Sequence, residues 1–140
     1  MEIRKATPAD AGSIAGLLNQ LGYSQTAECV REKIGQLSGH PDADLAVAAL
    51  HEEVVGFISI HFIPQIATAG AFARISYLCV DETARANGIG RQLELYCEDL
   101  ARERQCDRIE LHCHDRRTPA HAFYRRQGYE ESPKYLVKRL

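Results

Sequence analysis

A predicted strand, a glycine turn and an amphipathic helix follow one another in the middle of this chain, and their order most constrains its fold. Leu78-Cys79-Val80-Asp81 has the apolar character of a buried strand, and Arg85-Ala86-Asn87-Gly88-Ile89-Gly90-Arg91 follows it. From Ile89 to Arg104, apolar residues recur at steps of three and four, as they do along one face of a helix. A strand that leads through two glycines into a helix indicates an α/β protein.

The two glycines lie where this helix is expected to begin. The N–H groups of a first helical turn have no partner within the helix, and the helix dipole is positive there, so the site suits an anion. Gly88 and Gly90 let such an anion approach the backbone without a Cβ in the way. The third glycine of the dinucleotide pattern is missing, and Arg91-Gln92 stands where a P-loop needs lysine. The sequence therefore predicts a phosphate-binding turn of the form R-x-x-G-x-G.

The remaining segments alternate predicted strands and helices without a linker or a low-complexity stretch. Short apolar segments predict strands over residues 2–6, 45–50, 54–63, 73–80, 109–114 and 135–138. Helical patterns predict helices over about residues 8–21, 26–37, 89–104 and 119–127. Thr7-Pro8-Ala9-Asp10 has the features of a helix start, and His51-Glu52-Glu53 is expected to close a hairpin.

Length and composition favour one soluble enzyme domain over residues 1–140. The chain has 45% hydrophobic and 26% charged residues, which suits a packed core and excludes a disordered chain. A formal charge of -2 argues against nucleic acid as a partner. No signal peptide or run of about 20 apolar residues is present, so we expect a cytoplasmic protein without a membrane partner. The five cysteines are expected to be reduced and mostly buried.

A second motif lies near the C-terminus, where Ala120 to Tyr129 reads A-x-x-F-Y-x-x-x-G-[FY]. Together with the R-x-x-G-x-G turn and the order of predicted elements, it resembles the GNAT superfamily of N-acetyltransferases over essentially the whole chain. Within that family, the sequence is most similar to aminoalkylphosphonate acetyltransferases, for example at Glu53-Val54-Val55-Gly56 and Gly128-Tyr129-Glu130. The resemblance implies an α/β (α+β) fold with a mixed, mostly antiparallel sheet of six or seven strands and about four helices. It also implies a splay between the strand ending at Val80 and the strand Ile109–His114.

The same resemblance implies acetyl-CoA as cosubstrate and assigns residues to it. In the family, the strand before the glycine turn pairs through its backbone with the pantetheine arm and the thioester, and the turn binds the pyrophosphate. Tyr124 occupies the position of the family's general acid toward the thiolate, and His114 stands where many members carry an asparagine that contacts the coenzyme. The residues implied for cofactor binding are Leu78, Cys79, Val80, Arg85, Ala86, Asn87, Gly88, Ile89, Gly90, Arg91 and His114.

The general base is left open by the sequence. The phosphonate acetyltransferases would be expected to carry a glutamate before the glycine turn, but Arg74-Ile75-Ser76-Tyr77 contains no carboxylate. Tyr77, His61 or a water molecule are the alternatives for accepting the proton. His112, His114 and His121 raise the alternative of a metal site, but they lack a second pair of ligands at the usual spacing, so no metal is predicted.

These patterns predict an enzyme that transfers an acetyl group from acetyl-CoA to an amine of a small molecule. Direct attack in a ternary complex is expected, because no cysteine stands beside an evident activating base. A peptide or protein N-terminal acetyltransferase is the alternative within the class. A non-catalytic regulator that binds acyl-CoA is the alternative of another class. A homodimer is among the assemblies that the sequence leaves open.

Overall fold

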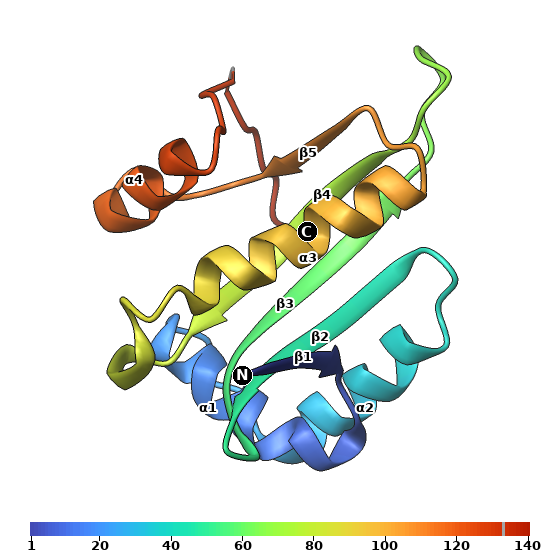
Figure 1. Ribbon diagram of the computed structural model, residues 1–140. Helices are drawn as coiled ribbons and strands as arrows, with labels where there is room; N and C mark the ends of the chain where they lie inside the picture. Colours follow the sequence, from blue (N-terminus) through green and yellow to red (C-terminus); the bar gives the residue numbers. More distant parts are fainter. Residues whose placement is uncertain (133) are drawn as a thin grey trace. The chain divides into compact units, whose positions relative to one another are not determined.

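The computed structural model describes residues 1–132 and 134–140, which form two compact units, residues 1–110 and residues 111–140 (Figure 1). The larger unit contains β1 (Glu2–Lys5), η1 (Pro8–Asp10), α1 (Ala11–Gln20), α2 (Ala27–Ser38), β2 (Ala43–Leu50), β3 (Glu53–Ile63), β4 (Phe72–Val80), η2 (Glu82–Ala84) and α3 (Ile89–Glu103). β5 (Arg108–Leu111) crosses the boundary, and α4 (Thr118–Arg126) lies in the smaller unit. None of the described helices has the length and apolar character needed to cross a membrane.

The described strands form one sheet in the order β1-β2-β3-β4-β5. The first three pairings are antiparallel, with Ile3 opposite Ala48 and Phe57 opposite Cys79 as examples of the register. β4 and β5 run in the same direction in Figure 1, joined by α3. The predicted α/β class, the mixed sheet and the four α-helices are confirmed for the described residues. The predicted number of strands, six or seven, is wrong, because the described sheet has five.

Helices cover both faces of the sheet in the larger unit. On one face, α1 and α2 pack on side chains of β2, β3 and β4 in an apolar cluster that includes Ile14, Ile34, Val47 and Phe57. On the other face, α3 packs against β3 at Gly56, where an added Cβ would lie 3.2 Å from the Leu93 side chain. Glycine at this position therefore lets the first turns of α3 approach the sheet closely.

The local signals for the first helix and the hairpin are confirmed. Asp10 accepts a hydrogen bond from the backbone N–H of Thr7 at 2.8 Å, as expected for an acid three residues after a helix cap. The helix begins with the 3-10 turn η1 and ends before Gly22, whose φ is 98°. β2 and β3 are joined by His51 and Glu52, both with positive φ, in a two-residue turn of the kind that matches strand twist.

Of the two strands predicted near the C-terminus, one is shorter than expected and the other is not observed. The strand predicted over Ile109–His114 is observed as Arg108–Leu111, so His112 and His114 lie beyond its end. The described residues in 135–138 form no strand. Tyr135 instead stacks on the ring of His112, with ring centroids 4.1 Å apart. The prediction of mostly buried cysteines is also wrong, since only Cys79 and Cys97 among the five are buried.

Candidate functional site

Among the described strands, β4 has a neighbour on both sides along only part of its length. It pairs with β3 from Phe72 to Val80. On the other side, the backbone N–H of Asp107 donates to the carbonyl of Ala71 at 2.8 Å. The side chain of Arg74 then reaches Glu110 of β5 at 3.2 Å. The second contact lies three positions after the first on both segments, so the two segments run in the same direction. β5 therefore lies beside the beginning of β4 and is parallel to it.

These contacts divide β4 into two ends. We call Phe72–Ile75 the paired end, since it lies between β3 and β5. Ser76–Val80 is the open end, because the four-residue β5 stops at Leu111 and β4 continues past it. The predicted splay between these two strands corresponds to the open end. A strand edge of this kind offers backbone N–H and C=O groups to an extended ligand.

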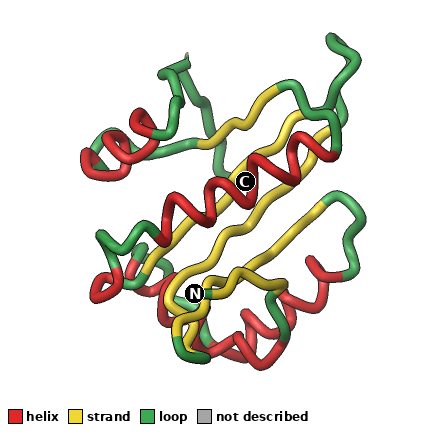
Figure 2. The backbone as a smooth tube through the Cα atoms, viewed as in Figure 1, coloured by secondary structure: helices red, strands yellow, loops and turns green. Residues whose placement is uncertain are grey.

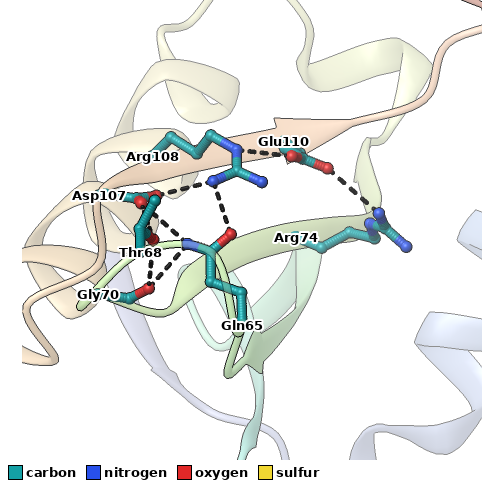
Figure 3. A network of polar contacts seen from close by, with 7 residues as sticks. All are labelled: Gln65, Thr68, Gly70, Arg74, Asp107, Arg108 and Glu110. Carbon is teal, nitrogen blue, oxygen red and sulfur yellow. Dashed lines mark hydrogen bonds and ion pairs between the residues drawn. The ribbon is translucent and has the colours of Figure 1, made fainter.

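A polar network fastens the paired end. Asp107 accepts hydrogen bonds from the Thr68 hydroxyl at 2.8 Å and from the Gln65 side chain at 2.9 Å (Figure 3). Arg108 donates to Asp107 at 2.9 Å, to the side-chain carbonyl of Gln65 at 3.1 Å and to Glu110 at 2.7 Å. The loop between β3 and β4, drawn green in Figure 2, is thereby tied to the beginning of β5.

The turn after the open end is held at its entrance by α1. Asp81 accepts from the backbone N–H of Thr83 at 2.9 Å and begins η2. The Gln20 side chain donates to Asp81 at 3.0 Å and accepts from the backbone N–H of Glu82 at 3.1 Å. The hydrogen bonds from Thr83, followed by that from Gln20, hold the pKa of Asp81 below its ordinary value. The carboxylate therefore stays ionised and keeps the entrance to the turn in place.

The turn enters α3 through left-handed backbone. Ala86 has φ 72° and Gly88 has φ 74°. A left-handed conformation costs an alanine about 1–2 kcal/mol, and such strain clusters at binding sites. Gly88 is the N-cap of the 15-residue α3, and in the described part of the chain no side chain makes a capping hydrogen bond there. The first N–H groups of a long helix are thus presented at an exposed glycine, which is a favourable place for a phosphate.

Comparison with known families agrees with this arrangement of strand, turn and helix. The model of the acetyltransferase (GNAT) family matches residues 15–129. The chain belongs to the GNAT family of acetyltransferases. It is 31% identical over 144 aligned positions to the aminoalkylphosphonate N-acetyltransferase of Salmonella typhimurium, covering 99% of this chain and 91% of the relative.

Solved structures share the fold of this GNAT chain. A transcriptional regulator from Bacillus halodurans C-125 superposes with a TM-score of 0.90 at 25% identity, over 99% of both chains. A ribosomal-protein-alanine N-acetyltransferase from Brucella melitensis biovar Abortus 2308 superposes with a TM-score of 0.81 at 19% identity, over all of both chains. The second likeness concerns the fold alone.

The predicted cofactor residues of the larger unit lie together in this GNAT chain. Leu78, Cys79 and Val80 end β4 on the open end, and Arg85 to Arg91 form the turn and the first turn of α3. The buried Cys79 thiol points toward α1, where its sulfur lies 3.4 Å from the carbonyl of Leu17. The Nε of Arg85 donates to the carbonyl of Val80 at 3.2 Å. The arginine therefore contacts the same strand end that is predicted to bind the coenzyme.

Tyr124 lies on α4 in the smaller unit. Its ring is half-buried and makes edge contacts with Phe123 and Tyr129, with centroids 5.1 Å and 5.5 Å away. Gly128 follows the helix with φ 94°, and the backbone N–H of Tyr129 donates to the carbonyl of Tyr124 at 3.0 Å. The second sequence motif thus forms a helix end that fixes the tyrosine ring from two sides.

Two histidines of the smaller unit, His114 and His121, are hydrogen-bonded within a turn. The Nδ1 of His114 accepts from the backbone N–H of Arg116 at 3.1 Å, and its carbonyl is bonded to the ring of His121 at 2.8 Å. Among the described residues, no group of three or more histidine, cysteine, aspartate or glutamate side chains is arranged to hold a metal ion. His112 and His114 both follow the end of β5, so they do not share one face of a strand.

Sequence reasoning missed a contact on the open end. The register of β3 and β4 shifts so that Ser59 faces Tyr77 while Ile60 faces Ile75, which leaves Ser76 as the extra residue of a β-bulge. The hydroxyl of Ser76 is hydrogen-bonded to the Nδ1 of His61 at 2.9 Å. A bulge depends on pairing between distant segments, so no local pattern could have revealed this bond.

Proposed function

We propose that this chain transfers an acetyl group from acetyl-CoA to a primary amine of a small molecule, by direct attack in a ternary complex. Membership of the acetyltransferase family supports the reaction class. The relative from Salmonella typhimurium, which is named for acetylation of an aminoalkylphosphonate, supports a small amine as acceptor.

One observation carries the proposal. The open end of β4 leads directly into an exposed, glycine-capped helix start. An extended pantetheine arm could add to the strand edge while its pyrophosphate meets the N–H groups of α3. The two features suit the two chemically different parts of one ligand, and they follow each other directly along the chain.

The proposed roles follow from what acyl transfer needs. The backbone of Leu78 to Val80 binds the pantetheine arm and polarises the thioester carbonyl. Arg85 and Arg91 supply positive charge near the pyrophosphate. Tyr124 donates a proton to the departing thiolate, because a phenol with the ordinary tyrosine pKa of about 10 is protonated at neutral pH and so has a proton to give. The amine lone pair forms the new N–C bond as the C–S bond breaks.

Direct transfer is supported by the state of the buried cysteines. Burial raises the pKa of Cys97 to about 12, with the nearby charge of Glu94 adding to the effect. A thiol with this pKa is almost entirely protonated at neutral pH and is a poor nucleophile. Cys79 is likewise buried, against α1. Neither residue favours an acetyl-cysteine intermediate.

The experiment that tests the proposal measures thiol release from acetyl-CoA with a panel of amines. The panel contains an aminoalkylphosphonate, a polyamine, an amino sugar and a peptide with a free N-terminus. We expect turnover with a small amine, with the aminoalkylphosphonate as the first candidate. A preference for the peptide would instead indicate an N-terminal acetyltransferase, and absence of turnover with every amine would contradict the proposal.

A second candidate is a regulator that binds acyl-CoA without turning it over. The similar protein from Bacillus halodurans, which is named a transcriptional regulator and is 25% identical, favours it. Thermal stabilisation by acetyl-CoA with no thiol release on any amine would support the regulator. Stabilisation together with thiol release would support the enzyme.

A further inference from the structure

The hydrogen bond between His61 and Ser76 lies where an acyl-transfer reaction needs a base. Ser76 is the first residue of the open end, two positions before Leu78. Its hydroxyl lies 2.9 Å from the Nδ1 of His61, on the neighbouring strand. The bulge places Ser76 and Tyr77 side by side in the exposed part of β4, while His61 is half-buried. The imidazole is thus fixed beside the beginning of the edge that is proposed to bind the thioester.

We infer that His61 is the general base of the acetyl transfer, held in position by Ser76. This inference rests on the proposed function. The Nδ1–H group donates to the serine hydroxyl, which leaves the lone pair of Nε2 to take a proton from the acceptor's ammonium group. The neutral amine then attacks the thioester carbon, and its nitrogen loses a second proton to solvent. The C–S bond breaks, and the thiolate takes a proton from Tyr124, which is reprotonated from solvent. His61 returns the first proton to water.

The charges around His61 favour its neutral form. Burial lowers its pKa below the ordinary value of 6.5, and the positive charges of His40 and Arg74 lower it further. His40 precedes β2, and Arg74 faces His61 from β4. Arg74 is itself paired with Glu110, which moderates its effect. A neutral imidazole at pH 7 is ready to accept a proton, as a base must be.

Tyr77, the other side chain considered for this role, is a poorer base. Burial raises its pKa above 10, with a smaller contribution from Tyr23. The ring makes an edge contact with Tyr23, with centroids 5.5 Å apart. A phenol with a raised pKa stays protonated at neutral pH and cannot take up a proton. The two side chains that the sequence left open as the base are thereby separated.

The test compares His61→Gln with His51→Gln. His51 is an exposed histidine in the turn between β2 and β3, so its replacement controls for loss of an imidazole on the same pair of strands. For His61→Gln we expect kcat to fall by roughly 100-fold or more. The affinity for acetyl-CoA, measured by calorimetry, should be unchanged. The limb of the kcat–pH profile below pH 7 should disappear, and the residual rate should rise with hydroxide.

Ser76→Ala tests the positioning role. It should lower kcat by about tenfold, a smaller loss than removal of the base itself, and retain the acidic limb. Ser76→Thr, which keeps a hydroxyl, should restore the rate. Titration of the His61 ring by NMR in the unaltered protein gives a readout that needs no variant. A ring pKa below 6.5 is expected, and a value above 7 would overturn the inference.

The possible outcomes distinguish a failure of the His61 assignment from a failure of the proposed function. If the unaltered protein is active and His61→Gln has the same rate and pH profile, His61 is not the general base. The proposed acetyltransferase function would be unaffected by that result. Equal losses in His61→Gln and His51→Gln would also overturn it. Absence of turnover in the unaltered protein with every amine would overturn the proposed function, and the base with it.

Discussion

The two ends of β4 belong to one strand and yet differ in almost every interaction. The paired end lies between β3 and β5, and its neighbouring loop is tied down by Asp107 and Arg108. The open end has β3 on one side and leads into left-handed backbone at Ala86 and Gly88. Among the described strands, the paired end has a neighbour on both sides, whereas the open end is paired with β3 alone.

The difference suggests that one end of β4 contributes mainly to stability and the other mainly to ligand binding. Substitutions at the paired end should change the free energy of unfolding and leave ligand binding intact. Substitutions at the open end and its turn should change ligand binding more than stability. Substitution of a catalytic residue outside β4 should lower kcat and leave both ligand affinity and stability unchanged. The four predictions below test these three expectations, beginning with the largest effect.

Tyr124→Phe tests the chemistry outside β4. The substitution keeps the ring between Phe123 and Tyr129 and removes the hydroxyl. If the tyrosine protonates the thiolate, kcat should fall by roughly 100-fold, while acetyl-CoA affinity and stability stay unchanged. Steady-state and single-turnover kinetics measure this. A loss confined to KM would show that the hydroxyl only binds substrate, and an unaffected single turnover would show that it is not the acid.

Gly70→Ala tests the paired end through stability. An added Cβ would lie 2.8 Å from the carbonyl oxygen of Gln105 and 3.4 Å from the backbone nitrogen of Asp107, so the loop or the beginning of β5 must shift. Overpacking of this kind costs about 2 kcal/mol of unfolding free energy, measurable by denaturation. Gly39→Ala is the control, since its nearest contacts are an ordinary 3.8 Å and 4.0 Å. Equal stability of the two variants would contradict the assignment.

Gly88→Val tests the open end through binding. A valine side chain at the start of α3 would stand before its N–H groups, so acetyl-CoA should bind at least tenfold more weakly, about 1.4 kcal/mol. Gly22→Val is the matched control, because both glycines have positive φ and open space around them. Both variants should lose stability from backbone strain. Calorimetric titration should show weaker binding only for Gly88→Val, and equal affinities would remove the phosphate-binding assignment.

Glu110→Gln tests the paired end through pH. Burial alone would raise the pKa of Glu110, but hydrogen bonds from Arg108 and Arg74 outweigh burial and lower it. A carboxylate with a lowered pKa stabilises the fold above its unfolded value of about 4.3 and loses this contribution as the pH falls through the folded value. At pH 7 the variant should lose less than about 1 kcal/mol. Once the pH has fallen below the folded pKa the two proteins should have similar stability, and a difference that stays constant as the pH is lowered would contradict the pairing.

Local signals in the sequence predicted much of the larger unit. Thr7, Pro8 and Asp10 marked the first helix because a helix start satisfies its own orphan groups with nearby residues. Gly22 marked its end, and the alternating pattern with His51-Glu52 marked the hairpin. The glycine turn was predicted for the same reason, since its conformation depends on residues within the turn.

The errors arose where structure depends on distant partners. An apolar pattern over 109–114 is compatible with a strand, but a strand continues only while a neighbour pairs with it, and β5 stops at Leu111. The bulge at Ser76 and its bond to His61 require two strands in a particular register. The ion pair of Arg74 with Glu110 joins residues 36 positions apart. No periodicity in a single segment specifies such contacts.

The bond between Gln20 and the backbone N–H of Glu82 makes one amide a reporter for hydrogen exchange. Its partner is 62 positions away, so this amide is protected only while the end of α1 is docked against the start of the turn. Its exchange rate therefore reports the separation of the end of α1 from the start of the turn, and not local opening within a single helix. Slower exchange of this amide on addition of acetyl-CoA would show that ligand binding stabilises the contact between α1 and the turn.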